Sequence, residues 1–309
     1  MPYYLGIDGG GTKTTCAVGD EARVLATATA GPSNIVRVGE AHARESLQRC
    51  VRDACASAGI KLEQVAHTCV GGAGAARPEL AAIVREIVAE IVSTPIDVVG
   101  DMQTALEAAF GTGPGVVVNA GTGSFAYGRN QGGQTLRAGG WGFAIGDEGS
   151  AHWIGRMAVS AVLRASEHQS HDEGMPPLAK DLFKAWGVGS LLDLARAANS
   201  IPPPDFAALF PAVAASSDEL ARQVLRNAGR ELADIAVVVI RRLFASDGSA
   251  VVPVAMTGGV FRHAAIVREV FYNDLRRIDA RVQVNPQVVD PVVGALRMAR
   301  MAASKTIEK

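Results

Sequence analysis

Cysteine, aromatic residues and excess charge of either sign are all scarce in this sequence. Its 309 residues include four cysteines and 5% aromatic residues, and 31 acidic side chains nearly balance 30 basic ones to leave a net charge of −1. Basic residues are scattered along the chain, which argues against a nucleic-acid footprint or a membrane-surface patch. We therefore expect neither nucleic acid nor a membrane among the partners.

Long hydrophobic runs are also missing. No apolar stretch approaches the ~20 residues that span a bilayer, and the run at residues 235–240 is bounded by charged residues on both sides. The N-terminal segment has no basic stretch followed by an apolar one, so no signal peptide is predicted. We expect a cytoplasmic location.

The cysteines form no recognisable metal or redox motif. Cys16, Cys50, Cys55 and Cys69 include no C-x-x-C pair, and no histidine stands at metal-ligand spacing from them. Free cysteine behaves as a small hydrophobic residue. We expect four buried structural thiols.

The order of the predicted elements indicates an α/β protein with mixed sheets, and the length suggests two domains. In the first third we expect strands at 3–8, 14–18, 24–30, 65–70 and 96–99, with helices at about 41–58 and from residue 78. Later we expect strands at 116–119, 124–128, 251–256 and 281–284, a mainly helical stretch at 150–244, a helix at about 263–278 and a terminal helix from about residue 287.

Both halves begin with a strand, a glycine-rich hairpin and a second strand, which indicates a weak internal duplication. Within the helical stretch, Ser216 and Glu219 have the spacing of a capping box before an apolar run.

The first glycine-rich hairpin joins Asp8 to Thr14 through three glycines, Thr12 and Lys13. It is not a P-loop, because Thr12 separates the glycines from the lysine and a strand follows instead of a helix. Such a turn can still present backbone N–H groups to a phosphate, or it can be an ordinary tight hairpin. Asp8, at the end of its strand, could hold Mg²⁺ directly or through water.

The second hairpin, residues 119–124, repeats this arrangement of an apolar strand, a small loop and a strand. Thr122 adds a hydroxyl donor to the loop. Two hairpins of this kind, one in each half, could hold a polyphosphate from opposite sides, and the pair is more specific than either member.

Asp101 follows a short apolar strand, at the sheet edge where ligands bind in α/β folds. A carboxylate there could accept the proton of an attacking hydroxyl during phosphoryl transfer. Alternatively, Asp101 could cap the helix that begins near Met102.

Two further glycine-rich segments suit binding loops. Residues 139–150 surround Trp141 with glycines and acidic residues, which suits a sugar site with an aromatic wall. The alternative is a surface loop in which Trp141 is packed and Asp147 caps the next helix. Gly258 and Gly259, between a strand and a helix, could let an adenine lie against the backbone.

Taken in order, these five elements resemble the superfamily of sugar kinases, actin and heat-shock ATPases. More narrowly, the chain resembles the N-acetylglucosamine kinase and BadF/BadG/BcrA/BcrD ATPase family, from Ile7 to about Leu296. The resemblance implies an α/β fold with two ribonuclease H-like (actin-like ATPase) domains, mixed sheets flanked by helices and a ligand cleft between the domains. The implied domains are residues 1–114 plus about 288–309, and residues 115–287 with a helical insertion.

The resemblance also implies a role for each motif. Asp101 matches the base that activates the sugar 6-hydroxyl. The implied sugar-contacting residues are Asn34, Asp101, Thr122, Gly140, Trp141 and Asp147. The implied nucleotide-binding residues are Gly10, Gly11, Thr12, Lys13, Thr122, Gly123, Gly258 and Gly259, with ATP and Mg²⁺ as cofactors.

One position departs from the family pattern. Animal N-acetylglucosamine kinases have an asparagine near the sugar after the Gly-Thr-Gly-Ser sequence, whereas Phe125 stands here. The departure leaves glucosamine or another hexose open as the substrate.

The resulting expectation is an ATP-dependent kinase for the 6-hydroxyl of an amino sugar, most simply N-acetylglucosamine or glucosamine. One alternative is the ATPase activator of a CoA-thioester reductase or dehydratase, which needs cysteine ligands for an iron–sulfur cluster near the second hairpin; no cysteine follows Cys69. Another is an ATP-dependent sugar sensor, although a DNA-binding module has no room before Asp8. The helical stretch could form a homodimer surface.

Overall fold

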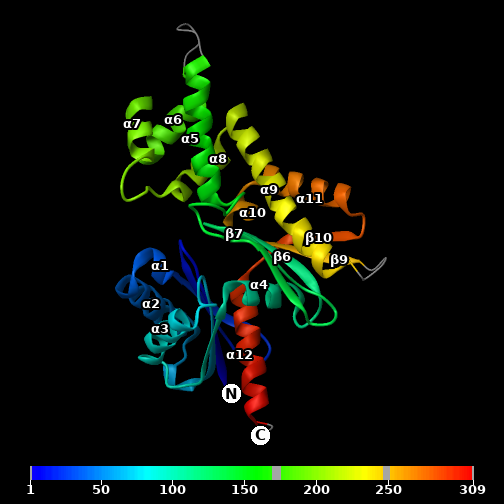
Figure 1. Ribbon diagram of the computed structural model, residues 1–309. Coiled ribbons are helices and arrows are strands. Elements are labelled where there is room, and N and C mark those ends of the chain that lie inside the picture. Colours follow the sequence, from blue (N-terminus) through cyan, green and yellow to red (C-terminus); the bar gives the residue numbers. More distant parts are fainter. Residues whose placement is uncertain (1, 169–174, 246–250, 308–309) are drawn as a thin grey trace. The chain divides into compact units, whose positions relative to one another are not determined.

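The computed structural model describes residues 2–168, 175–245 and 251–307 (Figure 1). The chain forms two compact units: the first contains Met1–Gly113 and Val289–Lys309, and the second contains Pro114–Val288. The first unit is therefore assembled from both ends of the chain, whereas the second is continuous. In the part of the chain described, no helix has the length and apolar character needed to cross a membrane.

A mixed five-stranded sheet forms the centre of the first unit. Its strand order is β3-β2-β1-β4-β5, with β1 antiparallel to β2 and parallel to β4, and β4 parallel to β5. The strands are β1 (Tyr3–Gly9), β2 (Thr14–Gly19), β3 (Val24–Ala30), β4 (Val65–Gly72) and β5 (Ile96–Gly100). Gly9 pairs with Gly72 and Gly72 with Gly100, so the carboxyl ends of the three parallel strands align at one edge. Asp8 and Asp101 flank this row of glycines.

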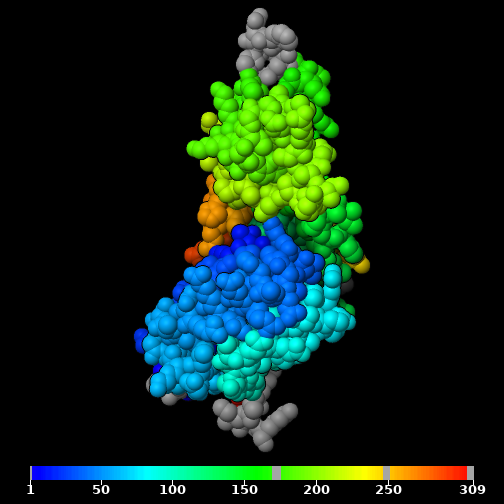
Figure 2. Space-filling view, turned by 90° about the vertical axis from the view of Figure 1, so that its left-hand side faces the viewer, coloured from blue at the N-terminus to red at the C-terminus, as the bar shows by residue number. Residues whose placement is uncertain are grey.

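Helices cover both faces of the first sheet. They are α1 (Ile35–Val38), α2 (Glu40–Ala58), α3 (Pro78–Ala89), α4 (Asp101–Phe110) and α12 (Pro291–Ile307), with a 3₁₀ turn at Leu62–Gln64. The buried positions of α2 repeat at helical spacing, from Ala43 through Leu47 to Val51 and Ala54. These positions and α3 form one apolar core with the sheet, and Figure 2 shows the outer surface of α2 and α3 in blue and cyan.

The opposite face of the first sheet carries α4 and α12, which enclose a second, smaller core around Tyr4 and Cys69. Two glycines allow α12 to approach closely. A Cβ on Gly6 of β1 would lie 2.2 Å from the backbone N of Leu296, and a Cβ on Gly294 would lie 2.0 Å from the carbonyl O of Thr104 in α4. A larger residue at position 6 would push α12 away from the sheet, and one at position 294 would push it away from α4.

The second unit is built around another mixed five-stranded sheet. Its order is β10-β9-β6-β7-β8, with β6 antiparallel to β7 and parallel to β9, and β7 antiparallel to β8. The strands are β6 (Gly115–Ala120), β7 (Ser124–Arg129), β8 (Thr135–Gly139), β9 (Val252–Thr257) and β10 (Val282–Val289). Each unit thus places its hairpin strands and its parallel strand in the same order, which confirms the predicted internal duplication.

A mainly helical insertion separates β8 from β9. Its helices are α5 (Ala151–His168), α6 (Pro177–Trp186), α7 (Leu191–Ala198), α8 (Phe210–Ala215) and α9 (Glu219–Leu243), with a 3₁₀ turn at Phe206–Leu209. Two more helices, α10 (Gly259–His263) and α11 (Ala265–Ile278), join β9 to β10. The long helix α9 packs on the sheet and on α11, and its buried residues run through the largest core of the molecule. Figure 1 shows α9 in yellow beside α11 in orange.

Two predicted helix starts are wrong. The capping box at Ser216 does not form, because α9 begins at Glu219 with Asp218 as its N-cap and Ser216 ends α8 instead. The terminal helix does not begin near Gln287, which lies in β10; it begins at Pro291. Pro286 suggests an end to the strand, but β10 is at the edge of its sheet, where a proline removes no ladder hydrogen bond.

Two other elements differ from the expectation. Strand β8 was not predicted, since it is short, has no buried residue and carries only two apolar side chains larger than a hydrogen, those of Leu136 and Ala138. The helix expected at about residues 263–278 is α11, but a short helix that was not expected, α10, precedes it, with the extended residue Ala264 between the two. The four cysteines are buried and free, as predicted.

Candidate active site

The first hairpin joins β1 to β2 and is closed by a hydrogen bond from the Gly10 N–H to the Lys13 carbonyl at 3.0 Å. Its exposed tip carries the side chains of Thr12 and Lys13. None of its three glycines has a positive φ. Glycine at position 9 is explained by the close approach of Ser33 instead, because a Cβ on Gly9 would lie 2.7 Å from the Ser33 hydroxyl oxygen.

Asn34 is held beside this hairpin. Its backbone N–H donates to the Gly10 carbonyl at 3.2 Å, and its side-chain Oδ1 accepts from the Val36 N–H at 3.1 Å as the N-cap of α1. The structure therefore brings one predicted sugar-contacting residue next to the first predicted phosphate loop.

Asp8 lies at the end of β1, beneath the hairpin. Its pKa is raised from 3.8 to about 7, first by burial and then by the negative charges of Asp101 and Asp290, while the charge of Lys13 lowers it. Three carboxylates of the first unit thus act on one another at the edge where the parallel strands end. Ionised Asp8 is costly in this setting, and a bound cation would reduce the cost.

Asp101 is the first residue of α4, and Gly100 is the N-cap. One oxygen of its carboxylate accepts the adjacent N–H of Met102 at 3.0 Å, while its carbonyl accepts the hydroxyl of Thr104 at 2.9 Å. The capping position belongs to Gly100, whose N–H bonds to the side chain of Gln103 at 3.2 Å. Asp101 is therefore not the N-cap of α4, and the negative charge of its carboxylate acts on Asp8.

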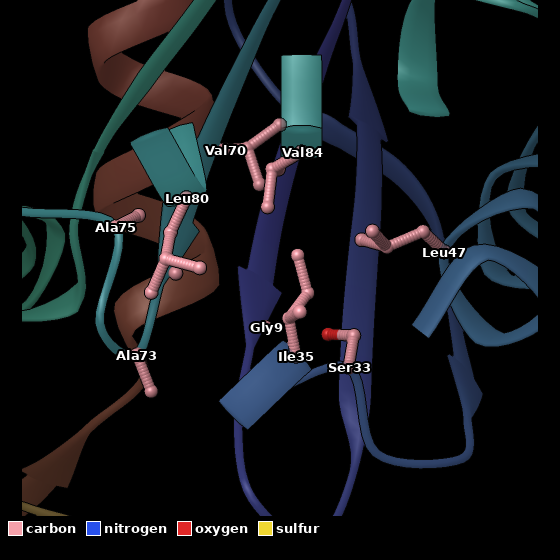
Figure 3. Close-up of a pocket in the computed structure, with 10 residues that line it drawn as sticks. Gly9, Ser33, Ile35, Leu47, Val70, Ala73, Ala75, Leu80 and Val84 are labelled. Atoms are coloured by element: carbon pink, nitrogen blue, oxygen red, sulfur yellow. The ribbon is translucent and has the colours of Figure 1, made fainter. Parts of the chain in front are cut away.

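A small cavity lies below the hairpin and is lined almost wholly by apolar groups (Figure 3). Side chains of Ile35, Leu47, Leu80 and Val84 surround it, and the only side-chain polar atom is the hydroxyl of Ser33, which already accepts the hydroxyl of Thr14 at 2.8 Å. No charged side chain lines this cavity to hold a phosphate. The polar groups of the first unit are at the hairpin and strand ends above it.

The second hairpin joins β6 to β7 and is closed from the Gly121 N–H to the Gly123 carbonyl at 2.9 Å. Its carbonyls also receive the first N–H groups of α5: Ala151 donates to Gly121 at 2.9 Å, and His152 donates to Thr122 at 3.3 Å. The start of α5 is thereby tied to the loop. This satisfies helix donors that would otherwise need a cap.

Asp147 connects the second hairpin to the Trp141 loop, residues 139–150. Burial raises the pKa of its carboxyl, and hydrogen bonds from the backbone N–H groups of Gly142 and Ser124 lower it. A Cβ on Gly123 would lie 2.8 Å from an Asp147 carboxylate oxygen, so a larger residue there would displace this carboxylate. Asp147 also has a φ of 60°, which is unusual for a residue other than glycine. Such a strained residue persists where its surroundings fix it, often at a functional site.

Asp147 does not cap α5, because Ser150 does so by accepting the Trp153 N–H on its hydroxyl at 3.1 Å. Nor is Trp141 packed away, since it is 72% exposed. These two observations contradict the packed Trp141 and the Asp147 cap that the sequence left open as an alternative.

The Gly258–Gly259 turn lies directly against the second hairpin. Gly258 has a φ of 102°, and a Cβ on it would lie 2.3 Å from the Ala120 carbonyl. Gly259 begins α10, as expected for a strand–glycine–glycine–helix turn. In the second unit the structure therefore brings together the hairpin, Asp147 and this turn.

The comparison with known proteins assigns the chain. The BadF/BadG/BcrA/BcrD ATPase family matches residues 5–299. This chain is a member of that family. It is 30% identical over 305 residues to the N-acetylmuramic acid/N-acetylglucosamine kinase of Clostridium acetobutylicum, covering 97% of this chain and 99% of the relative.

Two further relatives agree over nearly the full length. The N-acetyl-D-glucosamine kinase of Dictyostelium discoideum is 28% identical over 310 residues, covering 96% of this chain and 97% of the relative. The crystal structure of a candidate N-acetylglucosamine kinase from Chromobacterium violaceum aligns with a TM-score of 0.74 at 26% identity, covering 97% and 99% of the two chains. The expected two-unit fold of this family, with mixed sheets flanked by helices, is thus confirmed.

Phe125, where this family member departs from the animal kinases, is buried under the Trp141 loop. It pairs with Gly139 across β7 and β8, and a Cβ on Gly140 would lie 3.2 Å from its own Cβ. The ring is 8% exposed. Phe125 therefore supports the loop from below.

Two residues of this site were missed from the sequence. Asp290 precedes the first residue of α12, and its carboxylate accepts the Val292 N–H at 3.3 Å while its charge acts on Asp8. An acidic residue directly before a proline that starts a helix was the available signal. The other is Arg137, on the unpredicted strand β8, for which the sequence held no signal.

Proposed function

We propose that this chain is an ATP-dependent kinase that transfers the terminal phosphate of ATP to the 6-hydroxyl of an amino sugar, with N-acetylglucosamine as the first candidate. The observation that carries the proposal is the position of Asp8 and Asp101 at the edge where the parallel strands of the first sheet end, with the charge of Asp101 acting on Asp8, in a chain whose full-length relatives are named as kinases of N-acetylated amino sugars. A second carboxylate next to a potential base is what hydroxyl activation near a cation requires.

The proposed role of Asp101 is to accept the proton of the sugar hydroxyl while its oxygen attacks the γ-phosphorus. The bond from that phosphorus to the β–γ bridging oxygen breaks, and ADP leaves. Phosphoryl transfer of this kind depends mainly on positioning and electrostatics. The hairpin N–H groups from Gly10 to Lys13, and those of Thr122 and Gly123, are proposed to bind phosphate oxygens.

Asp8 is proposed to hold Mg²⁺, which would neutralise charge on the transferred phosphate. The carboxylate is a hard oxygen ligand whose ionisation is opposed by burial and by Asp101 and Asp290, so a divalent cation fits it. Within the described ranges, no three His, Cys, Asp or Glu side chains form a metal cage. This agrees with Mg²⁺, which commonly takes one or two carboxylates together with substrate phosphates and water.

The sugar is proposed to contact Asn34 and Asp101 in the first unit, and Thr122, the Gly140 backbone, Trp141 and Asp147 in the second. The exposed indole of Trp141 offers an apolar face, and the Asp147 carboxylate offers hydrogen-bond acceptors, as small-molecule sites commonly combine. Gly258 and Gly259 are proposed to lie against the adenosine. Phe125 replaces an amide with an apolar ring, so glucosamine stays an alternative substrate.

An activator of a CoA-thioester enzyme is the second candidate from the fold. It would need a cluster of cysteine ligands, but the four cysteines of this sequence end at Cys69 and all are buried in the first unit. A purified protein without iron would agree with the kinase. An iron–sulfur absorption band would instead favour the activator.

The test of the proposal is ADP release from Mg-ATP with N-acetylglucosamine, glucosamine, N-acetylmannosamine and glucose, each compared with a sugar-free blank. Saturable stimulation by an amino sugar, with the phosphate located on O6 by NMR, is the expected result. ATP binding without stimulation by any of the four sugars would reject the proposal.

The role of Asp101 has its own test. Asp101→Asn should lower kcat by roughly 10²–10⁴-fold, the usual contribution of a general base, and change the sugar KM only a few-fold. Asp53→Asn is the matched control, because Asp53 is an exposed helix residue whose contact is an ion pair with Arg49 at 3.6 Å. Near-normal kcat in Asp101→Asn would remove Asp101 from the base role.

A further inference from the structure

Arg137 lies on β8, immediately before the Trp141 loop. Its Nε donates to the carbonyl of Gly139 at 3.0 Å, and its Nη2 donates to the carbonyl of Gly140. One planar guanidinium therefore holds two consecutive carbonyls where the strand turns into the loop. Lysine could not do the same, because its single ammonium group lacks the fixed fork of donors.

The turn that Arg137 holds is an uncommon one. Gly139 and Gly140 have φ angles of 69° and 70°, so two successive residues are in the left-handed region. Glycine enters this region at little cost but is also free to leave it. Along the loop, the first carbonyl that accepts hydrogen bonds from the loop's own backbone is that of Gly142, which accepts from the N–H groups of Ile145 and Gly146. Among the described contacts, the carbonyls of Gly139 and Gly140 are bonded by Arg137.

The same guanidinium also lies over the ring of Trp141, with its Cζ 5.7 Å from the ring centroid. A cation in this position is attracted to the negative face of the indole. Trp141 is 72% exposed and has no other described aromatic contact. Because the hydrophobic core does not fix this side chain, the interaction with Arg137 can set its orientation. The positive charge of Arg137 also lowers the pKa of Asp147, one of the two acidic residues of the loop.

We propose that Arg137 is a positioning residue of the sugar site, which fixes the Gly139–Gly140 turn and holds the Trp141 indole in the orientation on which a sugar stacks. This inference rests on the proposed function. Arg137 itself does not contact the reacting groups. Its effect is on the sugar affinity, through Trp141, and not on the phosphate transfer.

The test compares Arg137→Met and Arg137→Lys with the control Arg196→Met. Arg196 is an exposed arginine of α7 in the same unit, and its contact is an ion pair with Asp193 at 3.4 Å. In Arg137→Met we expect the sugar KM to rise about tenfold or more, with kcat at saturating sugar and the KM for ATP within about threefold. Arg137→Lys should recover part of this loss, since it keeps the cation–π interaction but not the fork.

A second measurement does not depend on turnover. Time-resolved fluorescence anisotropy of Trp141, obtained by subtracting the signal of the Trp141→Phe counterpart of each protein, reports how freely the indole moves. We expect faster and wider motion in Arg137→Met than in the wild type or in Arg196→Met. If no sugar is a substrate, the proposed function fails while this arm still decides whether Arg137 orients Trp141.

Two outcomes would overturn the inference. One is unchanged Trp141 motion in Arg137→Met. The other is a kinase in which Arg137→Met lowers kcat and the melting temperature together while the sugar KM stays constant, because that pattern describes a general structural residue.

Discussion

Replacing Asp8 by Asn should stabilise the nucleotide-free protein at pH 8 and have little effect on it at pH 4. The pKa of Asp8 is raised from 3.8 to about 7, mainly by burial and further by Asp101 and Asp290. Between these values the folded protein keeps a proton that the unfolded chain releases, so the wild type loses stability as the pH rises from about 4 to 7. Asparagine does not titrate, and the variant therefore escapes this loss.

The size of the effect follows from the shift. One pKa unit corresponds to ~1.4 kcal/mol, so a shift of about three units sets a ceiling of about 4 kcal/mol. Because Asp8 keeps partial contact with solvent, screening reduces this, and we expect about 1–2 kcal/mol. At roughly 2–4 °C per kcal/mol for a protein of this size, the gap in Tm should widen by about 2–8 °C across the window.

The assay is thermal unfolding followed by circular dichroism at pH 4 to 8, with EDTA present and without nucleotide. Asp20→Asn is the control of opposite sign. The pKa of Asp20 is lowered, chiefly by hydrogen bonds from the backbone N–H groups of Arg23 and Ala22, so its replacement should lower stability by a nearly constant amount from pH 8 to pH 5, because this contribution is lost only as the pH falls through the lowered pKa. A difference between Asp8→Asn and the wild type that stays constant over the whole range would refute the reasoning.

Two further predictions concern stability and can be checked by urea denaturation. Gly258→Ala should lower the free energy of unfolding by roughly 2–4 kcal/mol, because the new Cβ would lie 2.3 Å from the Ala120 carbonyl oxygen and the residue has a φ of 102°. Gly259→Ala should lower it by less than about 1 kcal/mol, because a Cβ there has nothing within 4 Å. Asp218→Ala should lower the free energy of unfolding by roughly 1–3 kcal/mol, because the Asp218 carboxylate both caps α9 and accepts the Leu178 N–H at 2.8 Å. Ser216→Ala should lower it by less than about 1 kcal/mol, because Ser216 does not cap α9. Equal losses within either pair would contradict these explanations.

The strands and hairpins could be predicted because their signals are local. Apolar runs end at glycine clusters, and the two hairpins follow the strands that the sequence indicates, at Asp8 and at Asn119. The duplication is also visible locally, since each half begins with the same pattern. Asp101 and Asp147 stood out because an acidic residue at a strand end or among glycines is unusual.

The missed features depend on tertiary position. Strand β8 is short and has no buried residue, and β10 continues past Pro286 at the edge of its sheet, where proline is tolerated. Asp290 is far from Asp8 in the sequence, and only the return of α12 to the first sheet brings its charge close enough to act on Asp8. The role of Arg137 can be inferred only once the backbone conformation of Gly139 is known.

The close packing of α12 on β1 has a consequence for synthesis on the ribosome. The second unit is a continuous segment and can be completed while α12 is still unmade, but the face of the first sheet around Tyr4 and Cys69 stays open until Leu296 arrives. Domains usually mature in the order in which they emerge. Here the order is reversed, so the unit that begins first is completed last, and the apolar face of its sheet stays uncovered during the interval.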